Sequence, residues 1–318
     1  SFLHPEHENL IAQSLRASGY YVSVSSEILP EFREYERCST TVVNAYVSPV
    51  LGKYLTYLED KLEPGMHLSI MQSNGGAIQP AEARLAGVRC ILSGPAGGVV
   101  GCEYIGKSIS GGENLRLIGF DMGGTSTDVS LIDGTRQITT EAVVSGHPIH
   151  LPMLDIHTIG AGGGSIARID PGGALRVGPE STGADPGPAC YGKGDIPTIT
   201  DANVVLGRLA PEMFLGGKMQ LDAERSWHAI EKIAIELNME TTRVALGIIQ
   251  VANAHMERAL RVISVERGWD PRVFTLLSFG GAGGIHAADL ARGLGIPRVL
   301  VRSEERRVGK EGRSGWSP

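Results

Sequence analysis

Several features are scarce in this 318-residue sequence, and each absence narrows the range of functions. There is no apolar run of about 18 residues, the length that a membrane-spanning helix requires. The net charge of −6 provides no basic excess for binding a nucleic acid or an anionic membrane surface. The four cysteines stand far apart without a CxxC pair, which argues against a disulfide framework or a zinc knuckle. No secretion signal opens the chain, so we expect a reducing, cytoplasmic location.

Glycine, by contrast, is abundant: the chain has 43, about twice the usual share. The glycines cluster between apolar runs, in SNGG, SGPAGG, MGGT, GAGGG and SFGGAGG. Such clusters mark turns where the backbone approaches another group closely, although simple hairpin turns use the same residues. Strand patterns alternate with helix patterns along the chain, which indicates an α/β architecture.

Helical periodicity is clearest in two segments. Residues 39–62 are predicted as a helix with an apolar face that includes Val43, Val47 and Leu51. Residues 241–268 are predicted as the longest helix, with an apolar stripe of Val244, Ile248, Ala252, Met256, Leu260 and Ile263. Residues 20–26 are predicted as a strand, and the segment CILSGPAGG as a strand and a glycine turn before a helix that begins near Pro95.

The stretch GFDMGGTSTDVSLIDG, residues 119–134, places a glycine and hydroxyl loop between two short strands. Glycine lets backbone N–H groups approach a phosphate, and the hydroxyl groups add further donors. Asp121 and Asp128 stand at the two ends of the loop, where carboxylates can hold Mg²⁺ through water or orient an attacking water. Neither a Walker loop nor a dinucleotide fingerprint occurs. The predicted phosphate contacts are Gly123, Gly124, Thr125 and Ser126.

A second glycine loop, SFGGAGGIHA at residues 278–287, follows an apolar strand and opens a helix. Its amides are suited to a phosphate, or to an adenosine lying flat against the backbone. The two loops are separated by about 150 residues, and we expect both to serve one nucleotide. The predicted contacts in this loop are Gly280, Gly281, Gly283 and Gly284.

This pairing resembles the actin-like ATPase (ribonuclease-H-like) fold of sugar kinases, actin and some chaperones. The motifs SNGG, SGPAGGVVG, GFDMGGTSTDVS, DIHTIGAGGGSIA, GADPGPACYG, TDANVVLGRL and SFGGAGGIHA, in this order, are similar to the hydantoinase/oxoprolinase family, hydantoinase A type, over nearly all of residues 1–301. The resemblance implies an α/β fold with mixed sheets flanked by helices. It implies that residues 1–45 end an N-terminal domain and that residues 46–301 form the ATPase domain, with a second lobe from about 115.

The same resemblance implies ATP-dependent opening of a cyclic amide, such as a hydantoin or 5-oxoproline, through phosphorylation of the amide oxygen. ATP and Mg²⁺ would be the cofactors, with room for a second divalent metal, and a larger subunit of the hydantoinase B type would be the partner. Relatives carboxylate ketones such as acetone, so an ATP-dependent carboxylase subunit is the alternative. A nucleotide-dependent regulatory or chaperone-like switch is the alternative from another class, and a sugar kinase is a weaker one.

Members of this family carry another phosphate hairpin near the N-terminus, and no second DxGGT occurs here. We therefore expect a chain truncated at both ends, which holds half of the phosphate site and is inactive alone. Residues 302–318 lack apolar periodicity and resemble a translated sequencing adapter, so we expect a non-native tail.

Four further side chains need a role. Asp155 and His157 are two residues apart on a predicted strand, so they share a face and are candidate metal ligands; a hydrogen-bonded histidine is the simpler reading. The resemblance makes this pair a candidate for the active cleft. Cys190 is more consistent with a structural loop than with a nucleophile, which would need an adjacent base. Asp201 is expected to cap a helix rather than to act in catalysis.

Overall fold

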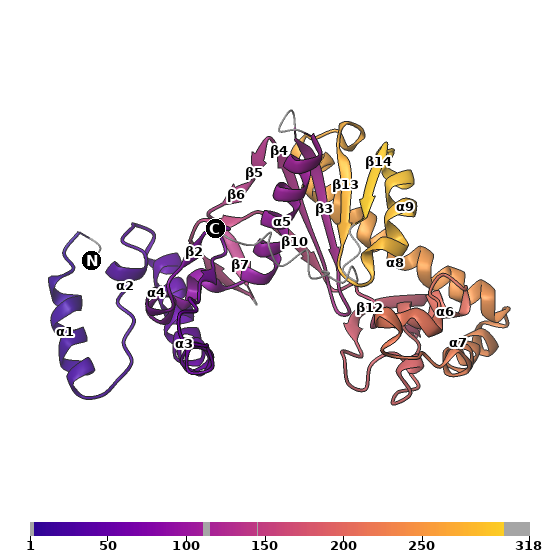
Figure 1. The fold of residues 1–318 in the computed structure, drawn as a ribbon, viewed down its shortest axis with the longest axis horizontal. Coiled ribbons are helices and arrows are strands. Elements are labelled where there is room, and N and C mark those ends of the chain that lie inside the picture. The colour runs from indigo at the N-terminus through magenta and orange to yellow at the C-terminus, as the bar shows by residue number, and fades with distance from the viewer. Residues whose placement is uncertain (1–2, 111–114, 145, 302–318) are drawn as a thin grey trace. The chain divides into compact units, whose positions relative to one another are not determined.

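The computed structural model describes residues 3–110, 115–144 and 146–301 (Figure 1). Its contacts divide the chain into two compact units, residues 1–113 with 135–155 and residues 114–134 with 156–318. Within the described ranges, no helix combines the length and apolar character needed to cross a bilayer. The expected non-native tail, residues 302–318, lies outside the described residues.

The second unit is built on one mixed sheet with the strand order β10-β4-β3-β13-β14. Neighbours among β10, β4 and β3 are antiparallel, whereas β3, β13 and β14 are parallel. Figure 1 shows β13 between β3 and β14, with α9 beside them. The bounds are β3 Arg116–Met122, β4 Thr127–Asp133, β10 Ile156–Ile159, β13 Thr275–Phe279, β14 Arg298–Val301, α8 Thr241–Ile263 and α9 Gly283–Leu294.

Strand alternation separates the two faces of this sheet. Ile118, Phe120 and Met122 on β3 join the main apolar core with residues of α8 and α9. Asp121 lies between them in the sequence, so its side chain points to the opposite face. The apolar stripe predicted for residues 241–268 is confirmed, because all six residues are buried in this core. The helix itself ends earlier, at Ile263, and among the described helices α3 is longer, with 26 residues against 23. The sheet therefore has an apolar face under α8 and α9 and a second face that carries acidic residues.

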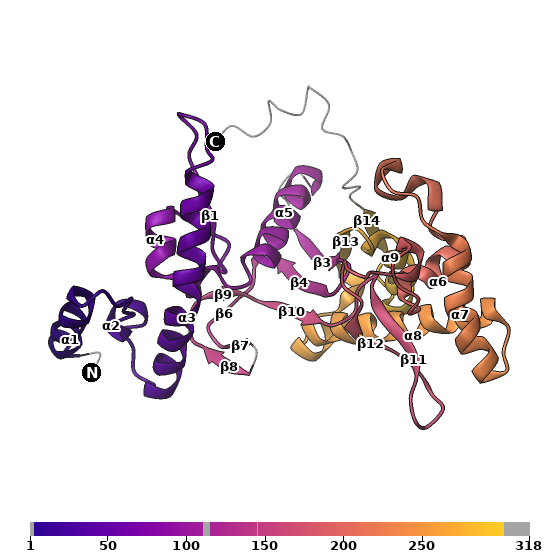
Figure 2. The same cartoon turned by 90° about the horizontal axis from the view of Figure 1, so that it is seen from below.

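The rest of the second unit is a hairpin and a helical group. β11 and β12 are antiparallel, and Figure 2 shows them as a projecting hairpin. Helix α6 begins with a capping box in which Thr198 is the N-cap and Asp201 the third helical residue, so the expectation that Asp201 is the N-cap was off by one turn. The bounds are β11 Ser165–Ile169, β12 Leu175–Ser181, η2 Ala189–Tyr191, α6 Ile199–Val205, η3 Pro211–Gly217, α7 Ala223–Leu237, η4 Val265–Arg267 and η5 Pro271–Val273.

The first unit is mainly helical. Its bounds are α1 Glu6–Ala17, α2 Ser25–Ile28, α3 Glu34–Glu59, β1 Ile70–Met71, β2 Ala77–Ile78, α4 Pro80–Leu85, η1 Gly87–Cys90, α5 Ser93–Ser110, β5 Thr135–Arg136, β6 Ile138–Thr139, β7 Ala142–Val144, β8 His147–Ile149 and β9 Met153–Leu154. Residues 20–24, predicted within a strand, are irregular, and the SGPAGG motif lies inside the first turns of α5 rather than in a loop. Helix α3 runs without a break through the predicted domain boundary at residue 45.

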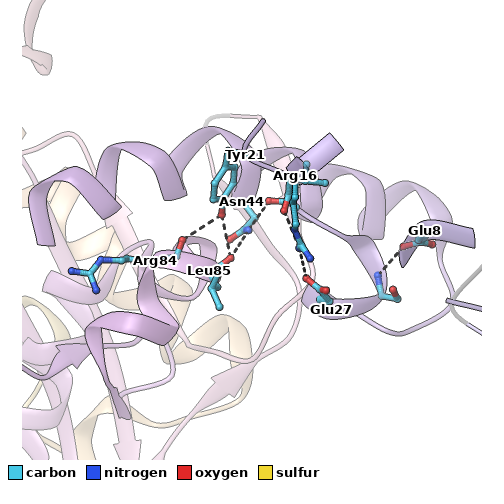
Figure 3. A network of polar contacts seen from close by, with 10 residues as sticks. Glu8, Arg16, Tyr21, Glu27, Asn44, Arg84 and Leu85 are labelled. Atoms are coloured by element: carbon cyan, nitrogen blue, oxygen red, sulfur yellow. Dashed lines mark hydrogen bonds and ion pairs between the residues drawn. The ribbon is translucent and has the colours of Figure 1, made fainter. Parts of the chain in front are cut away.

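Helix α3 buries a polar face, and the apolar face predicted for it is only partly covered. Asn44 donates to the Leu85 carbonyl oxygen at 2.9 Å (Figure 3) and accepts from the Val88 amide at 3.1 Å. Ser48 accepts from the Gly87 amide at 3.0 Å. Buried polar groups are tolerated when they are hydrogen-bonded, and here they hold the junction of α4 and η1, residues 85–88, against the helix. Apolar periodicity alone could not identify this face.

Candidate functional site

The loop between β3 and β4 is a tight hairpin turn with unused amides. The Gly123 amide donates to the Ser126 carbonyl oxygen at 3.0 Å, which closes the turn. The amides of Gly124, Thr125 and Ser126 donate to no other group in the part of the chain that the structure describes. A Cβ at Gly124 would meet nothing within 4 Å, so the space in front of the loop is open. The predicted phosphate contacts thus form one open, donor-rich turn.

A third glycine loop, residues 160–164, supports this hairpin from behind. The Gly163 amide donates to the Gly123 carbonyl oxygen at 3.0 Å, and the Gly164 amide donates to that of Gly124 at 2.6 Å. A Cβ at Gly162 would lie 2.5 Å from the Thr125 nitrogen. The carbonyl groups of Gly123 and Gly124 are therefore hydrogen-bonded to the glycine loop behind the hairpin. The amides of residues 124–126 remain available to a ligand in front of it. The sequence motif GAGGG was visible, but its pairing with the hairpin was not predicted.

The second predicted loop lies against the same hairpin. The Ala282 amide donates to the Met122 carbonyl oxygen at 3.0 Å. Gly280 has φ +80, and a Cβ there would collide with Asp121 Oδ1 and with the Met122 carbonyl. The structure thus brings together two loops that are far apart in the sequence.

The four glycines of this second loop have different surroundings. A Cβ at Gly281 would meet nothing within 4 Å, so this position is open to a ligand. Gly283 is buried and would clash with Ser278 Oγ at 2.7 Å, and a Cβ at Gly284 would lie 3.1 Å from Val301. The last two are therefore packing positions of α9 against the sheet.

The two predicted aspartates are direct neighbours across the hairpin. Asp121 pairs with Asp128 in the antiparallel register, so both side chains lie on the sheet face opposite α8 and α9. Thr158 of β10 donates to Asp128 Oδ1 at 2.5 Å. Burial raises the pKa of Asp128 above its ordinary value, and the Thr158 hydroxyl opposes this shift in part. Two adjacent carboxylates at the end of a phosphate turn are a suitable pair for a hydrated divalent cation.

Of the candidate metal pair, His157 lies on the other face of the sheet from these aspartates. His157 pairs with Val129 in the β10–β4 register, which places it on the face of α8, opposite to Asp128. Asp155 lies just before β10. Among the described residues, no group of three His, Cys, Asp or Glu side chains could hold a metal ion. A metal on Asp155 and His157 therefore stays a prediction.

Cys190 is a structural residue. It is buried, and burial together with the Asp201 carboxylate raises the pKa of its thiol far above the ordinary value. A thiol that does not ionise is a poor nucleophile, which agrees with the structural reading of its loop.

A buried histidine joins three helices beneath the second loop. His286 of α9 is fully buried, and its Nδ1 lies 2.7 Å from Asn253 Oδ1 on α8. Its Nε2 lies 3.4 Å from Asn203 Nδ2 on α6. The Nδ1–H tautomer satisfies both partners, because it donates to Asn253 and accepts from Asn203. Burial, with a smaller effect of the Arg208 charge, lowers the pKa of His286 to about 4, and Asp289 opposes this shift.

We expect His286 to make the protein less stable in mild acid. The unfolded chain gains a proton on this residue near pH 6.5, whereas the folded chain gains it only near pH 4. The free energy of unfolding should therefore fall between these values, by about 3 kcal/mol in all. Urea unfolding between pH 4 and 7.5 measures the slope. His286→Gln should flatten the dependence of the unfolding free energy on pH, whereas His255→Gln on the exposed side of α8 should leave it unchanged. Equal slopes in the parent and both variants would contradict the role of His286.

Known proteins resemble this chain in sequence and in structure. A sequence model described as hydantoinase/oxoprolinase matches residues 37–308. Caprolactamase subunit alpha of Pseudomonas jessenii is 41% identical over 309 residues, which cover 95% of this chain and 44% of that protein. A 5-oxoprolinase of Saccharomyces cerevisiae is 42% identical over a match that covers 95% of this chain and 24% of that protein. The nucleotide-free structure of acetone carboxylase, an enzyme of ATP-dependent acetone carboxylation, superposes with a TM-score of 0.81 and 31% sequence identity. The superposition covers 94% of this chain and 43% of the acetone carboxylase chain.

The solved structures show which fold this chain shares with its relatives and how much of their length it spans. The crystal structure of the Pseudomonas jessenii ATP-dependent caprolactamase superposes with a TM-score of 0.78. These likenesses confirm the predicted actin-like ATPase type of α/β fold with a mixed sheet flanked by helices. The chain spans less than half the length of the relatives described here.

Proposed function

Because the chain belongs to the hydantoinase/oxoprolinase family, we propose that it is the nucleotide-binding part of an enzyme that opens cyclic amides with hydrolysis of ATP. The observation that carries this proposal is the hairpin turn of residues 123–126, with three available amides in front and a glycine loop bonded behind. Two relatives are named for cyclic amides, caprolactam and 5-oxoproline. We therefore infer hydantoin, 5-oxoproline or a related lactam as the substrate class.

The residues at the hairpin suit ATP and Mg²⁺. The amides of Gly124, Thr125 and Ser126 would bind phosphate oxygens, and the open position at Gly281 would face the rest of the nucleotide. Asp121 and Asp128 would hold Mg²⁺ through its water ligands or orient a water molecule. When bound, ATP would supply a phosphoryl group to the amide oxygen, which makes the amide carbon a better electrophile for water. The raised pKa of Asp128 suits a group that takes up a proton near the reacting water.

The partner and the location are part of the same proposal. One relative is named subunit alpha, so we infer that a second, larger subunit of the hydantoinase B type completes the enzyme. Cys38, Cys90, Cys102 and Cys190 are all free thiols, which suits a reducing cytoplasm.

Nucleotide binding by the full-length gene product tests the proposal. Gly124→Val adds a side chain where no protein atom lies within 4 Å, so it should fold normally and obstruct the phosphate. We expect calorimetry to show Mg-ATP affinity reduced about tenfold or more. Gly101→Val on α5, where an added Cβ also meets nothing within 4 Å apart from its own helix backbone, is the matched control and should bind as the parent does. Equal affinity in Gly124→Val and the parent would refute the phosphate role of the turn.

A ketone carboxylase subunit is the second candidate, and the superposition on an acetone carboxylase favours it. The two activities differ in their products. A cyclic amidohydrolase gives a ring-opened product with ATP and no bicarbonate, whereas a carboxylase gives a carboxylated product that requires bicarbonate. ATP turnover without either small substrate would favour a nucleotide-dependent switch.

A further inference from the structure

A small cavity in the first unit has no role in the nucleotide site described above. Its volume is about 240 Å³, and it is lined by Gln72, Asn74, Arg89, Leu151 and Pro152. Two of these residues belong to the stretch QSNGG, which the nucleotide site leaves without a function. The volume accommodates a single small ring with substituents rather than a whole nucleotide, since pockets for drug-sized ligands measure roughly 300–1,000 Å³.

Backbone hydrogen bonds fix the walls of this cavity. The Ser73 amide and its hydroxyl both lie 2.7 Å from the Arg89 carbonyl oxygen, which ties the QSNGG turn to η1. The Leu154 amide donates to the Ser73 carbonyl oxygen at 2.7 Å and so brings the segment after Leu151 to the same place. Gly75 takes φ +81, which makes the turn possible. The cavity is therefore a preorganised feature of the unit.

The polar side chains of the cavity have unused hydrogen-bonding capacity. Gln72 is only 8% exposed, and its side-chain amide forms no hydrogen bond with another described residue, although its polar atoms still reach solvent. This amide is therefore available to a ligand in the cavity, where it would exchange water for a hydrogen bond to the ligand. Asn74 Oδ1 accepts from the Gly76 amide at 2.8 Å, which leaves the Asn74 NH₂ group available. Arg89 is exposed and forms no ion pair within the described part of the chain.

These groups match one kind of ligand chemistry. An unpaired guanidinium binds a carboxylate through two parallel hydrogen bonds. A carboxamide such as that of Gln72 presents a donor and an acceptor side by side, which complements the adjacent N–H and C=O of a cyclic amide. Leu151 and Pro152 provide an apolar surface for ring carbons. A purely anionic ligand would leave the Gln72 acceptor without a donor.

We propose that this cavity binds a cyclic amide that carries a carboxylate, with Gln72 on the ring amide and Arg89 on the carboxylate. Arg89 is then the residue that distinguishes acidic from neutral cyclic amides. The substrate identity rests on the function proposed above, but binding to the cavity requires no nucleotide.

A ligand-observed NMR titration of the full chain without ATP tests this assignment. The probes are 5-oxoproline and 2-pyrrolidinone, which has the same ring without the carboxylate. We expect 5-oxoproline to bind about 10- to 100-fold more tightly, the range given by a charged hydrogen-bonded pair. Arg89→Gln should abolish that preference, and Gln72→Leu should weaken both ligands. Arg33→Gln removes the same charge from an exposed arginine outside the cavity and should behave as the parent does.

Several results would overturn the proposal. Equal affinity of the parent for both rings, no binding of either ring, or a preference that survives in Arg89→Gln would each exclude it. Displacement of 5-oxoproline by a lower concentration of inorganic phosphate would make the cavity a general anion site instead. Thermal unfolding of each variant shows whether it is folded, and the surface change Arg89→Gln decides the result if Gln72→Leu is unstable. Because ATP is absent, failure here leaves the Gly124→Val test of the proposed function unaffected.

Discussion

Gly162→Ala is expected to abolish ATP binding and to lower the free energy of unfolding by about 1–3 kcal/mol, the usual effect of overpacking. The added Cβ would lie 2.5 Å from the Thr125 nitrogen and 2.6 Å from the Thr125 carbonyl carbon. Both are backbone atoms of the phosphate turn, so no rotamer change relieves the contact. The hairpin must move away, and its amides then lose the arrangement that a phosphate requires.

Urea unfolding and Mg-ATP calorimetry on the same variant separate the two effects. Gly172→Ala in the turn between β11 and β12 is the control, because its Cβ would approach only Asp170 Oδ1, at 3.2 Å. We expect this control to keep its stability within about 0.5 kcal/mol. If Gly162→Ala bound ATP as tightly as the control, the rear loop would have no part in shaping the phosphate site.

The comparison of Gly162 with Gly124 shows what local sequence reasoning can supply. The hairpin at residues 123–126 was predicted because strand patterns, glycines and flanking aspartates lie within one short stretch. The contact of Gly162 with Thr125 joins residues far apart along the chain, and nothing in the GAGGG motif specifies its partner. A glycine cluster indicates that the backbone is approached closely, but only the fold identifies the approaching group.

Helix α3 shows a second limit of the sequence pattern. A helix was predicted here correctly, but Asn44 and Ser48 face inward because the segment 85–88 offers backbone partners for them. Tyr46 on the same helix is 80% exposed. From hydrophobicity alone, Tyr46 would be expected to be buried and Asn44 and Ser48 to be exposed. By contrast, α8 packs on an apolar sheet face, and there the stripe predicted from the sequence is the buried one.

The same limit applies to the candidate ligands. Asp121 and Asp128 flank one short turn, so their proximity follows from hairpin geometry. Asp155 and His157 were predicted to share a face by strand alternation, but Asp155 lies just before β10, and the face that His157 occupies depends on the register with β4. That register separates His157 from the aspartates, which the sequence alone could not establish.

Asp201→Ala is expected to be the most destabilising single substitution of a polar residue described here, by about 3–5 kcal/mol. The Asp201 carboxylate is fully buried and serves as acceptor for several donors at once. Its hydrogen-bond donors are Ala189 N at 3.1 Å, Cys190 N at 2.9 Å, Thr198 N at 3.0 Å, Thr198 Oγ1 at 2.8 Å and Ser226 Oγ at 2.7 Å. Alanine would leave the Ala189 and Cys190 amides buried without an acceptor.

Urea unfolding compares this variant with Asp222→Ala, which removes the N-cap of α7 at an exposed position. Loss of that cap should lower the unfolding free energy by only about 1 kcal/mol. Hydrogen exchange should show lost protection at residues 189 and 190 in Asp201→Ala alone. Similar unfolding free energies of the two variants would contradict the role of Asp201 as a buried anchor.

The substitution should also weaken ATP binding, although Asp201 lies outside the phosphate turn. Thr200 precedes it at the start of α6, and both its amide and its hydroxyl donate to the Gly163 carbonyl oxygen, at 2.8 and 2.9 Å. Gly163 in turn donates to the Gly123 carbonyl oxygen at 3.0 Å. Loosening the start of α6 therefore releases the loop that holds the hairpin. If Asp201→Ala lost stability but kept the Mg-ATP affinity of the parent, this chain of hydrogen bonds would not be what positions the hairpin amides.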